Sequence, residues 1–511
     1  MEMNRTRRAF GKSVAAGLGS FVRVLPGAVR TTPKLLILIV AEQFRPDYLD
    51  RTDRYLGPGG FRRLMDEGTY FPDCRCAAST FTSSAIATLA TGCWPDVHGV
   101  VADQWYDRTA RGAVPARAET LLAGTVMAQI AALPRTRLFL CAMNERQAGL
   151  LQGTAPVRGF FMNTGGQFTT RGEEPAWLTE YNRLHAIENV HDAKWVALGA
   201  GADVPPLRTL AFESAHPERF FALYRSSPFA QEGQFEFIRE LIAREHLGQE
   251  ETQDLLVVSL GALAQLGHEV GGDSPLVDQL VLHLDRELDV TIDGLNKAPG
   301  AGNFALAFTG AHGAPPAPEP ARRARLAVPG EALARSLDRA LAERYDTATV
   351  RSVYVEKYVY PFLYLRPEVL RTRNARDVRA AAGRAALANP AVAGYYTADG
   401  DCSHHGEWER RFRNSFHALR SGDVMLAYQP GCVEDFGGGR GISYGSLYNY
   451  DARVPLFFFG PQFRGGVCED TVEAIDIAPT LARLAGAALP SSSTGRVLSE
   501  AFADVISRFR R

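Results

Sequence analysis

Three short apolar runs constrain the fold of this chain more than any other feature of its sequence. They cover residues 35–40, 255–260 and 304–309. Each has the length of one strand and is apolar at nearly every position, which is typical of strands buried on both faces of a parallel sheet. A helical pattern lies between the second and third runs, over residues 278–292. Strands that alternate with helices predict the α/β class, with a layered core.

The residues that follow these runs are the first candidates for function. In open α/β sheets, functional groups gather beyond the carboxyl ends of the strands. Glu42 follows the first run, residues 264–268 follow the second, and Ala311 and His312 follow the third. We therefore expect these positions to lie along one edge of the sheet.

A hydroxyl-rich segment, residues 79–84, leads into a helix of small residues that ends near Gly92. A hydroxyl at the start of a helix commonly caps the free backbone N–H groups. The same position also suits a nucleophile that acts on phosphate, because a helix N-terminus attracts anions. Thr82 is therefore a candidate nucleophile, and a helix cap is the alternative interpretation.

Together with further segments, this pattern resembles the alkaline phosphatase superfamily. The resemblance is strongest to its type I phosphodiesterase/nucleotide pyrophosphatase-like and phosphate-irrepressible alkaline phosphatase-like branches. The segments that carry it occur in the family's order: residues 40–49, 82–99, 267–268, 308–313, 420–423, 444–455, 476–480 and 495–498. The resemblance implies a three-layer sandwich, with a mostly parallel central sheet, helices on both faces and an inserted cap. We expect this domain over residues 33–511, with cap insertions at about 103–250 and 330–418.

The resemblance also implies a site at which two zinc ions clamp an in-line phosphoryl transfer. Carried over residue by residue, it places Thr82 at the nucleophile position and Asp103 at the position that contacts the phosphoryl group. It places Glu42, His268 and His312 at three of the metal-ligand positions.

The remaining ligand positions hold residues that do not suit zinc. Ala264 and Ala311 stand where the family has Asp, and Tyr444 stands where it has His. Alanine has no donor atom, and a tyrosine must ionise, with an ordinary pKa of about 10, to bind zinc well. The resemblance therefore implies an eroded metal site that holds zero or one zinc ion rather than two. Four nearby polar residues are alternative donors: Glu269, Asp273, His404 and His405.

Two functions follow from this substituted ligand set. The first is a catalytically impaired phosphoesterase homologue, a pseudoenzyme that binds a small phosphorylated ligand or a partner in the old cleft. The alternative is an active metal-dependent hydrolase of phosphomonoesters, phosphodiesters or sulfoesters. It would use Thr82 as the nucleophile and a rearranged or single-metal site. A third interpretation is a structural partner of an active homologue.

The net charge and the N-terminal segment limit the possible partners and the cellular location. Lys and Arg number 56 against 57 Asp and Glu, so the net charge is −1. With no basic excess we expect no nucleic-acid partner, and the first apolar run is too short for membrane insertion. Arg7 and Arg8 precede a mildly apolar stretch within residues 1–32. This pattern predicts a twin-arginine signal and a periplasmic or secreted protein, with a cytoplasmic one as the alternative. We expect a monomer or a homodimer.

Overall fold

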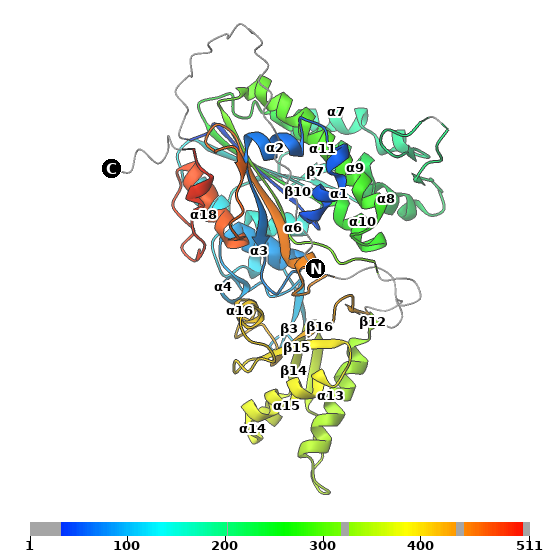
Figure 1. The fold of residues 1–511 in the computed structure, drawn as a ribbon, viewed down its shortest axis with the longest axis vertical. Coiled ribbons are helices and arrows are strands. Elements are labelled where there is room, and N and C mark those ends of the chain that lie inside the picture. The colour runs from blue at the N-terminus through cyan, green and yellow to red at the C-terminus, as the bar shows by residue number, and fades with distance from the viewer. Residues whose placement is uncertain (1–31, 202, 318–326, 436–443, 504–511) are drawn as a thin grey trace, which may run out of the picture.

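A ten-stranded sheet forms the centre of the main domain (Figure 1). The computed structural model describes residues 32–201, 203–317, 327–435 and 444–503. The three predicted strands are confirmed as β1 (Leu35–Ala41), β10 (Gln253–Leu260) and β11 (Phe304–Gly310). They are neighbours: β1 lies between β10 and β11 and is parallel to both. The three apolar runs therefore form the centre of the sheet.

The rest of the sheet continues outward on both sides of this centre. Its other strands are β5 (Thr136–Ala142), β6 (Arg158–Met162), β7 (Phe168–Thr170), β18 (Arg453–Phe459), β2 (Thr69–Arg75), β19 (Gly466–Val467) and β20 (Val472–Glu473). On one side, β5 and β6 are parallel to β10 and β7 closes the edge antiparallel. On the other side, β18 is antiparallel to both β11 and β2. The expected mostly parallel sheet is confirmed.

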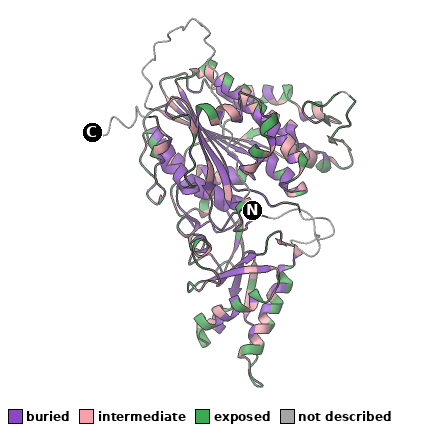
Figure 2. Ribbon diagram, viewed as in Figure 1, coloured by how far each residue is buried: buried purple, intermediate pink, exposed green. Residues whose placement is uncertain are grey.

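Helices cover both faces of this sheet, because alternate residues of each central strand point to opposite faces. In β1, Leu36, Leu38 and Val40 belong to one hydrophobic cluster, whereas the intervening residues of the strand belong to the other. The helices on the first face are α3 (Thr82–Thr91), α5 (Val126–Ala131), α6 (Glu145–Gln152) and α18 (Ile477–Ala485). The helices on the second are α1 (Asp47–Thr52), α2 (Phe61–Glu67), α7 (Ala176–Leu184), α8 (Pro217–Arg225), α9 (Pro228–Arg244), α10 (Ala262–Val270) and α11 (Pro275–Leu295). Figure 2 shows the sheet between these layers as almost wholly buried, as the three-layer sandwich requires.

A second, smaller sheet lies beyond one end of the main sheet (Figure 1). Its strands, in spatial order, are β13 (Val355–Val359), β14 (Phe362–Leu365), β16 (Val424–Tyr428) and β15 (Val392–Thr397). The helices of this part of the chain are α13 (Gly330–Tyr345), α14 (Pro367–Thr372), α15 (Ala375–Leu387) and α16 (Glu407–Asn414). Because β16 completes this sheet, the unit extends past residue 418, where the second insertion was expected to end.

The segment expected as a first cap insertion, residues 103–250, is not only a cap, because part of it belongs to the main sheet. It supplies β5, β6 and β7 to the main sheet, because β5 carries five buried residues in a row and continues the core outward from β10. Its hairpin of β3 (Gln104–Asp107) and β4 (Gly112–Pro115) instead reaches the smaller sheet, where the Tyr364 hydroxyl accepts a hydrogen bond from the backbone N–H of Tyr106.

The described chain also holds several short helices and strand pairs. They are α4 (Pro95–His98), α17 (Asn449–Ala452), the pair β8 (Lys194–Trp195) and β9 (Arg208–Thr209), and the pair β12 (Ala327–Val328) and β17 (Val433–Glu434). In the described part of the chain, every helix is too short or too polar to cross a bilayer. The candidate export signal falls on residues 1–31, which lie outside the described residues.

Candidate functional site

The carboxyl ends of the three central strands bring the candidate residues to one edge of the sheet. Glu42 directly follows β1, and its backbone N–H donates to Leu260, the last residue of β10. The backbone N–H of Ala311, just beyond β11, donates in the same way to Ala41 at the end of β1. Thus residues more than 200 positions apart in sequence meet at one place, as the strand pattern predicts.

Thr82 and His312 form a buried hydrogen-bonded pair at this edge. Thr82 is the first residue of α3, and its Oγ1 lies 2.8 Å from Nε2 of His312. The other ring nitrogen, Nδ1, lies 2.7 Å from the carbonyl oxygen of Gly313 and must donate to it. Nε2 is therefore the acceptor, and the Thr82 hydroxyl donates to it. Burial lowers the pKa of His312 to about 4, so the imidazole is neutral at pH 7.

Glu42 lies beside this pair, in the same buried place. Its Oε2 accepts a hydrogen bond of 3.1 Å from Nε2 of Gln147, in the first turn of α6. Burial, with a smaller contribution from the negative charge of Asp103, raises the pKa of Glu42 to about 8, and hydrogen bonds to the Gln147 and Thr82 side chains oppose the rise. In this structure the carboxyl group is thus protonated at pH 7.

Asp103 lies at the N-terminus of α3, next to Thr82. Its Oδ1 accepts a hydrogen bond of 2.9 Å from the backbone N–H of Ser83, and its Oδ2 accepts one of 3.1 Å from the hydroxyl of Tyr444. The position expected to contact a phosphoryl group therefore holds a carboxylate whose two oxygens already accept one hydrogen bond each.

Tyr444 packs its ring against the two histidines of the site. The centre of its ring is 4.4 Å from that of His312 and 4.9 Å from that of His268. Burial and the negative charge of Asp103 raise the pKa of its hydroxyl well above the ordinary value. In this structure Tyr444 is thus a neutral phenol that packs against both imidazole rings and donates to Asp103.

These residues do not fit a pair of zinc ions. Ala264 and Ala311 are buried and present only methyl groups, and Nε2 of His312 is bonded to Thr82. Nε2 of His268 lies 3.4 Å from the amide nitrogen of Gln43. Over the residues described here, no three His, Cys, Asp or Glu side chains are grouped so that they could hold a metal ion. The resemblance placed Glu42, His268 and His312 correctly at one edge, but their roles as ligands stay predictions.

The four alternative donors are engaged elsewhere. Glu269 pairs with Arg208 at 2.9 Å, and Asp273 pairs with Arg45 at 2.8 Å. Nδ1 of His404 lies 2.9 Å from the Ser403 hydroxyl, and the side chain of His405 is 94% exposed. None of these contacts points to a rebuilt metal site.

Two glutamines belong to the site although no sequence pattern singles them out. Gln147 bonds to Glu42 from a helix 105 residues away, and Gln43 bonds to His268. Gln43 has a φ of 61°, in the left-handed region that non-glycine residues seldom adopt. This outlier directly after β1 is visible only in the structure, because no residue type in the segment signals it.

A cavity of about 510 Å³ opens beside the site, between the main domain and the smaller sheet. The residues that line it include Phe81, Asp103, Arg146, Lys357, Tyr360 and Glu434. Asp103 thus faces both the buried site and a space that can hold a small molecule. The lining combines aromatic rings with charges of both signs, as small-molecule pockets often do.

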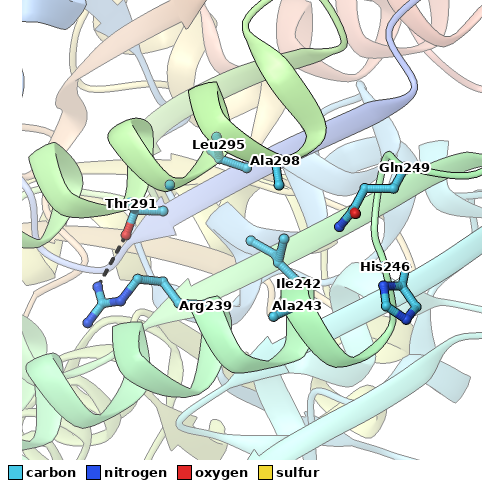
Figure 3. Close-up of a pocket in the computed structure, with 9 residues that line it drawn as sticks. Arg239, Ile242, Ala243, His246, Gln249, Thr291, Leu295 and Ala298 are labelled. Atoms are coloured by element: carbon cyan, nitrogen blue, oxygen red, sulfur yellow. Dashed lines mark hydrogen bonds between the residues drawn. The ribbon is translucent and has the colours of Figure 1, made fainter.

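A second cavity, of about 380 Å³, lies at the opposite edge of the sheet (Figure 3). Ile242 and Leu295 line it from α9 and α11, together with Gln249 and Ala298, which precede β10 and β11. It therefore lies near the amino ends of these strands, away from the candidate site. Arg239 on its wall is already paired with Glu287 at 2.6 Å.

Comparison with known proteins agrees with the architecture. The model of the family "type I phosphodiesterase/nucleotide pyrophosphatase" matches residues 36–434. Alkaline phosphatase PhoV of Synechococcus elongatus is 26% identical over 92% of this chain and 92% of its own length. Alkaline phosphatase PafA of Elizabethkingia meningoseptica is 23% identical over 92% of this chain and 94% of its own length.

Solved structures show the same fold. The crystal structure of wild-type alkaline phosphatase PafA has a TM-score of 0.79 and 22% identity, over 92% of this chain and 99% of that one. Murine ectonucleotide pyrophosphatase/phosphodiesterase 5 has a TM-score of 0.55 and 16% identity, over 89% of this chain and 95% of that one. At these identities the structures establish the architecture and leave the chemistry to the residues of the site.

Proposed function

Because the chain belongs to the type I phosphodiesterase/nucleotide pyrophosphatase family of the alkaline phosphatase superfamily, we propose that it keeps the family's fold and cleft but binds a small molecule there without two-metal hydrolysis. Its relatives include alkaline phosphatases, so the cleft descends from a phosphoesterase site. The observation that carries the proposal is the donor set: Ala264, Ala311 and Tyr444 stand where the resemblance requires ligands.

The contacts of the remaining groups support this proposal. Thr82 donates to His312, Gln147 donates to Glu42, and Tyr444 donates to Asp103. These bonds connect the residues of the site to one another, so that each of these six side chains has a hydrogen-bond partner within the site. The space that remains for a ligand is the 510 Å³ cavity beside them.

The test is hydrolysis by the full-length protein with excess zinc. We expect no turnover of para-nitrophenyl phosphate, bis-para-nitrophenyl phosphate or para-nitrophenyl sulfate above the background seen with a chelator. A variant that restores the donors, with Ala264→Asp, Ala311→Asp and Tyr444→His, serves as the matched control and should bind zinc. Zinc-dependent turnover by the unmodified chain that Thr82→Ala abolishes would contradict the proposal.

A hydrolase that uses Thr82 is the second candidate, and one observation favours it. The Thr82 hydroxyl donates to a neutral, buried imidazole whose tautomer is fixed by Gly313, and this is how a hydroxyl nucleophile and its base are commonly arranged. What speaks for binding instead is the charge of Asp103. This carboxylate lies at the start of α3 beside Thr82, whereas a phosphoryl group needs cationic or N–H donors.

Location and assembly rest on the sequence alone. We propose that Arg7 and Arg8 direct export of the chain to the periplasm or the medium, and that it is a monomer or a homodimer, or pairs with an active homologue. Cell fractionation with an Arg7→Lys, Arg8→Lys variant tests the first proposal. We expect the variant to stay in the cytoplasm, and unchanged export would contradict the role of the arginines.

A further inference from the structure

The N-terminus of α3 lacks a cap from its own N-cap residue. Phe81 precedes the helix with an extended backbone, and no side chain at that position accepts a hydrogen bond. The first N–H groups of a helix need acceptors and carry a partial positive charge, so an anion is favoured there. In this ten-residue helix, Asp103 supplies the anion, since its Oδ1 accepts from the backbone N–H of Ser83 at 2.9 Å.

A second donor holds the same carboxylate from the other side. The Tyr444 hydroxyl donates to Oδ2 of Asp103 at 3.1 Å. The Ser83 side chain is 1% exposed, and its hydroxyl has no hydrogen-bond partner among the described residues. A backbone N–H, a phenol and a spare hydroxyl are the kinds of donor that bind an oxyanion. Two of these donors, the N–H of Ser83 and the phenol of Tyr444, bind the carboxylate of Asp103, and the Ser83 hydroxyl belongs to the same first turn of α3.

Asp103 also faces the 510 Å³ cavity, so a ligand that enters the cavity meets this carboxylate. A phosphoryl group at the α3 terminus would have to displace it or lie against it. Two anions in contact repel strongly wherever water is partly excluded. The position that receives a phosphoryl group in the resemblance is therefore both filled and negatively charged.

We propose that Asp103 is a resident anion that determines specificity: it fills the anion position at the N-terminus of α3 and excludes phosphate and phosphoesters from the cavity. The inference rests on the proposed ligand-binding function and revises the expectation of a phosphorylated ligand. The molecule that the cavity takes up is neutral or cationic where it approaches Asp103.

The test measures binding of inorganic phosphate to the full-length protein by isothermal titration calorimetry. Asp103→Asn keeps an oxygen acceptor for the N–H of Ser83 but removes the charge. We expect it to bind phosphate at least about tenfold more tightly than the unmodified chain. Tyr444→Phe is the matched control, because it removes the donor and leaves the carboxylate, and it should gain nothing.

Two results would overturn the inference. One is equal phosphate affinity in Asp103→Asn and the unmodified chain, and the other is an equal gain in Tyr444→Phe. Circular dichroism and thermal unfolding check that each variant is folded, and Asp103→Ser provides a second charge-removing variant if Asp103→Asn is not. Either of these results, without turnover, contradicts only the role of Asp103, whereas zinc-dependent turnover contradicts the proposed function itself.

Discussion

At the scale of single residues, buried hydrogen bonds hold the site together, and most of the groups that form them are neutral. The Thr82–His312 pair shows this most directly, since both side chains are at most 1% exposed. A buried imidazole nitrogen that loses its partner carries the full cost of its desolvation. The stability of the fold thus depends on Thr82 and His312, two residues that the sequence analysis proposed as catalytic or metal-binding.

Replacing Thr82 tests this coupling. Thr82→Val removes the hydroxyl but keeps the shape, so Nε2 of His312 loses its donor, and we expect the free energy of unfolding to fall by about 1–3 kcal/mol. Thr82→Ser keeps the hydroxyl and serves as the control, with a smaller loss. Urea denaturation at pH 7 measures both. If Thr82→Val is as stable as the unmodified chain, the hydrogen bond at 2.8 Å contributes nothing.

Glu434, on the wall of the large cavity, gives the chain a pH-dependent stability. Its Oε2 accepts from the Tyr428 hydroxyl at 2.7 Å, and burial raises its pKa from 4.5 to about 7. The folded chain therefore keeps a proton that the unfolded chain releases between these values, so this residue's contribution to stability falls as the pH rises from 4.5 through 7. Above that range its contribution no longer changes.

Glu434→Gln isolates this effect. The glutamine cannot ionise, so the variant should gain stability relative to the unmodified chain as the pH rises from 5 to 8. Urea denaturation of both proteins across that range gives the difference, in which the titration of all other groups cancels. A difference that is the same at pH 5 and pH 8 would show that Glu434 has an ordinary pKa.

At the scale of elements, one buried carboxylate organises the start of a helix. Asp285 on α11 is 2% exposed and accepts from the backbone N–H of Gly57 at 2.8 Å and of Phe61 at 2.7 Å. Phe61 is the first residue of α2, which has no cap of its own. The close approach requires glycine at position 60, where a Cβ would lie 2.2 Å from Oδ1 of Asp285.

Asp285→Ala should therefore be costly, because it leaves two buried N–H groups without acceptors. We expect a loss of about 2–5 kcal/mol in the free energy of unfolding, and a clearly smaller loss for Asp285→Asn, which retains one acceptor. Thermal or urea unfolding measures the order of the two. Equal losses would mean that the charge, and not the accepted hydrogen bonds, matters here.

The elements also show where sequence reasoning succeeds. The central strands are predictable, because a short, unbroken apolar run is typical of a strand in a sheet that is covered on both faces. Asp476 shows the opposite case. Its position favours a cap for α18, but its carboxylate instead accepts from the backbone N–H groups of Glu473 and Arg496. The second partner is twenty residues away, and nothing in the local sequence indicates it.

At the scale of the whole molecule, Asp423 joins the main domain to the smaller sheet. It is 3% exposed, and its carboxylate accepts from Arg108, just beyond β3, at 2.6 Å and from Arg379 on α15 at 2.8 Å. The backbone N–H of Leu365 on β14 donates to it as well. The large cavity lies between the two units that this residue connects.

Asp423→Asn should consequently destabilise the chain by about 3 kcal/mol, the low end for a broken buried ion pair, because Arg108 is partly exposed. The surface pair of Arg376 and Asp401, at 2.8 Å, offers a control: Arg376→Ala should cost less than about 1 kcal/mol. Both are measured by urea denaturation. Equal costs would mean that Asp423 does not fasten the two units together.

The whole molecule also sets the limit of what the sequence could predict about the site. The strand ends place Glu42, His268 and His312 together, and this follows from topology. The resemblance places Tyr444 in the same site, but the contact of its ring with both imidazoles does not follow from the strand pattern. The same holds for Gln147, whose helix approaches from the first face of the sheet.

The most direct test of the account is the number of zinc ions bound per chain after equilibration with excess zinc and removal of loosely bound metal. The account predicts a ratio near zero for the unmodified chain, and a measurable gain for the variant with Ala264→Asp, Ala311→Asp and Tyr444→His. Two tightly bound zinc ions in the unmodified chain would contradict the account, because the chain would then have enough ligands for two zinc ions despite Ala264, Ala311 and Tyr444.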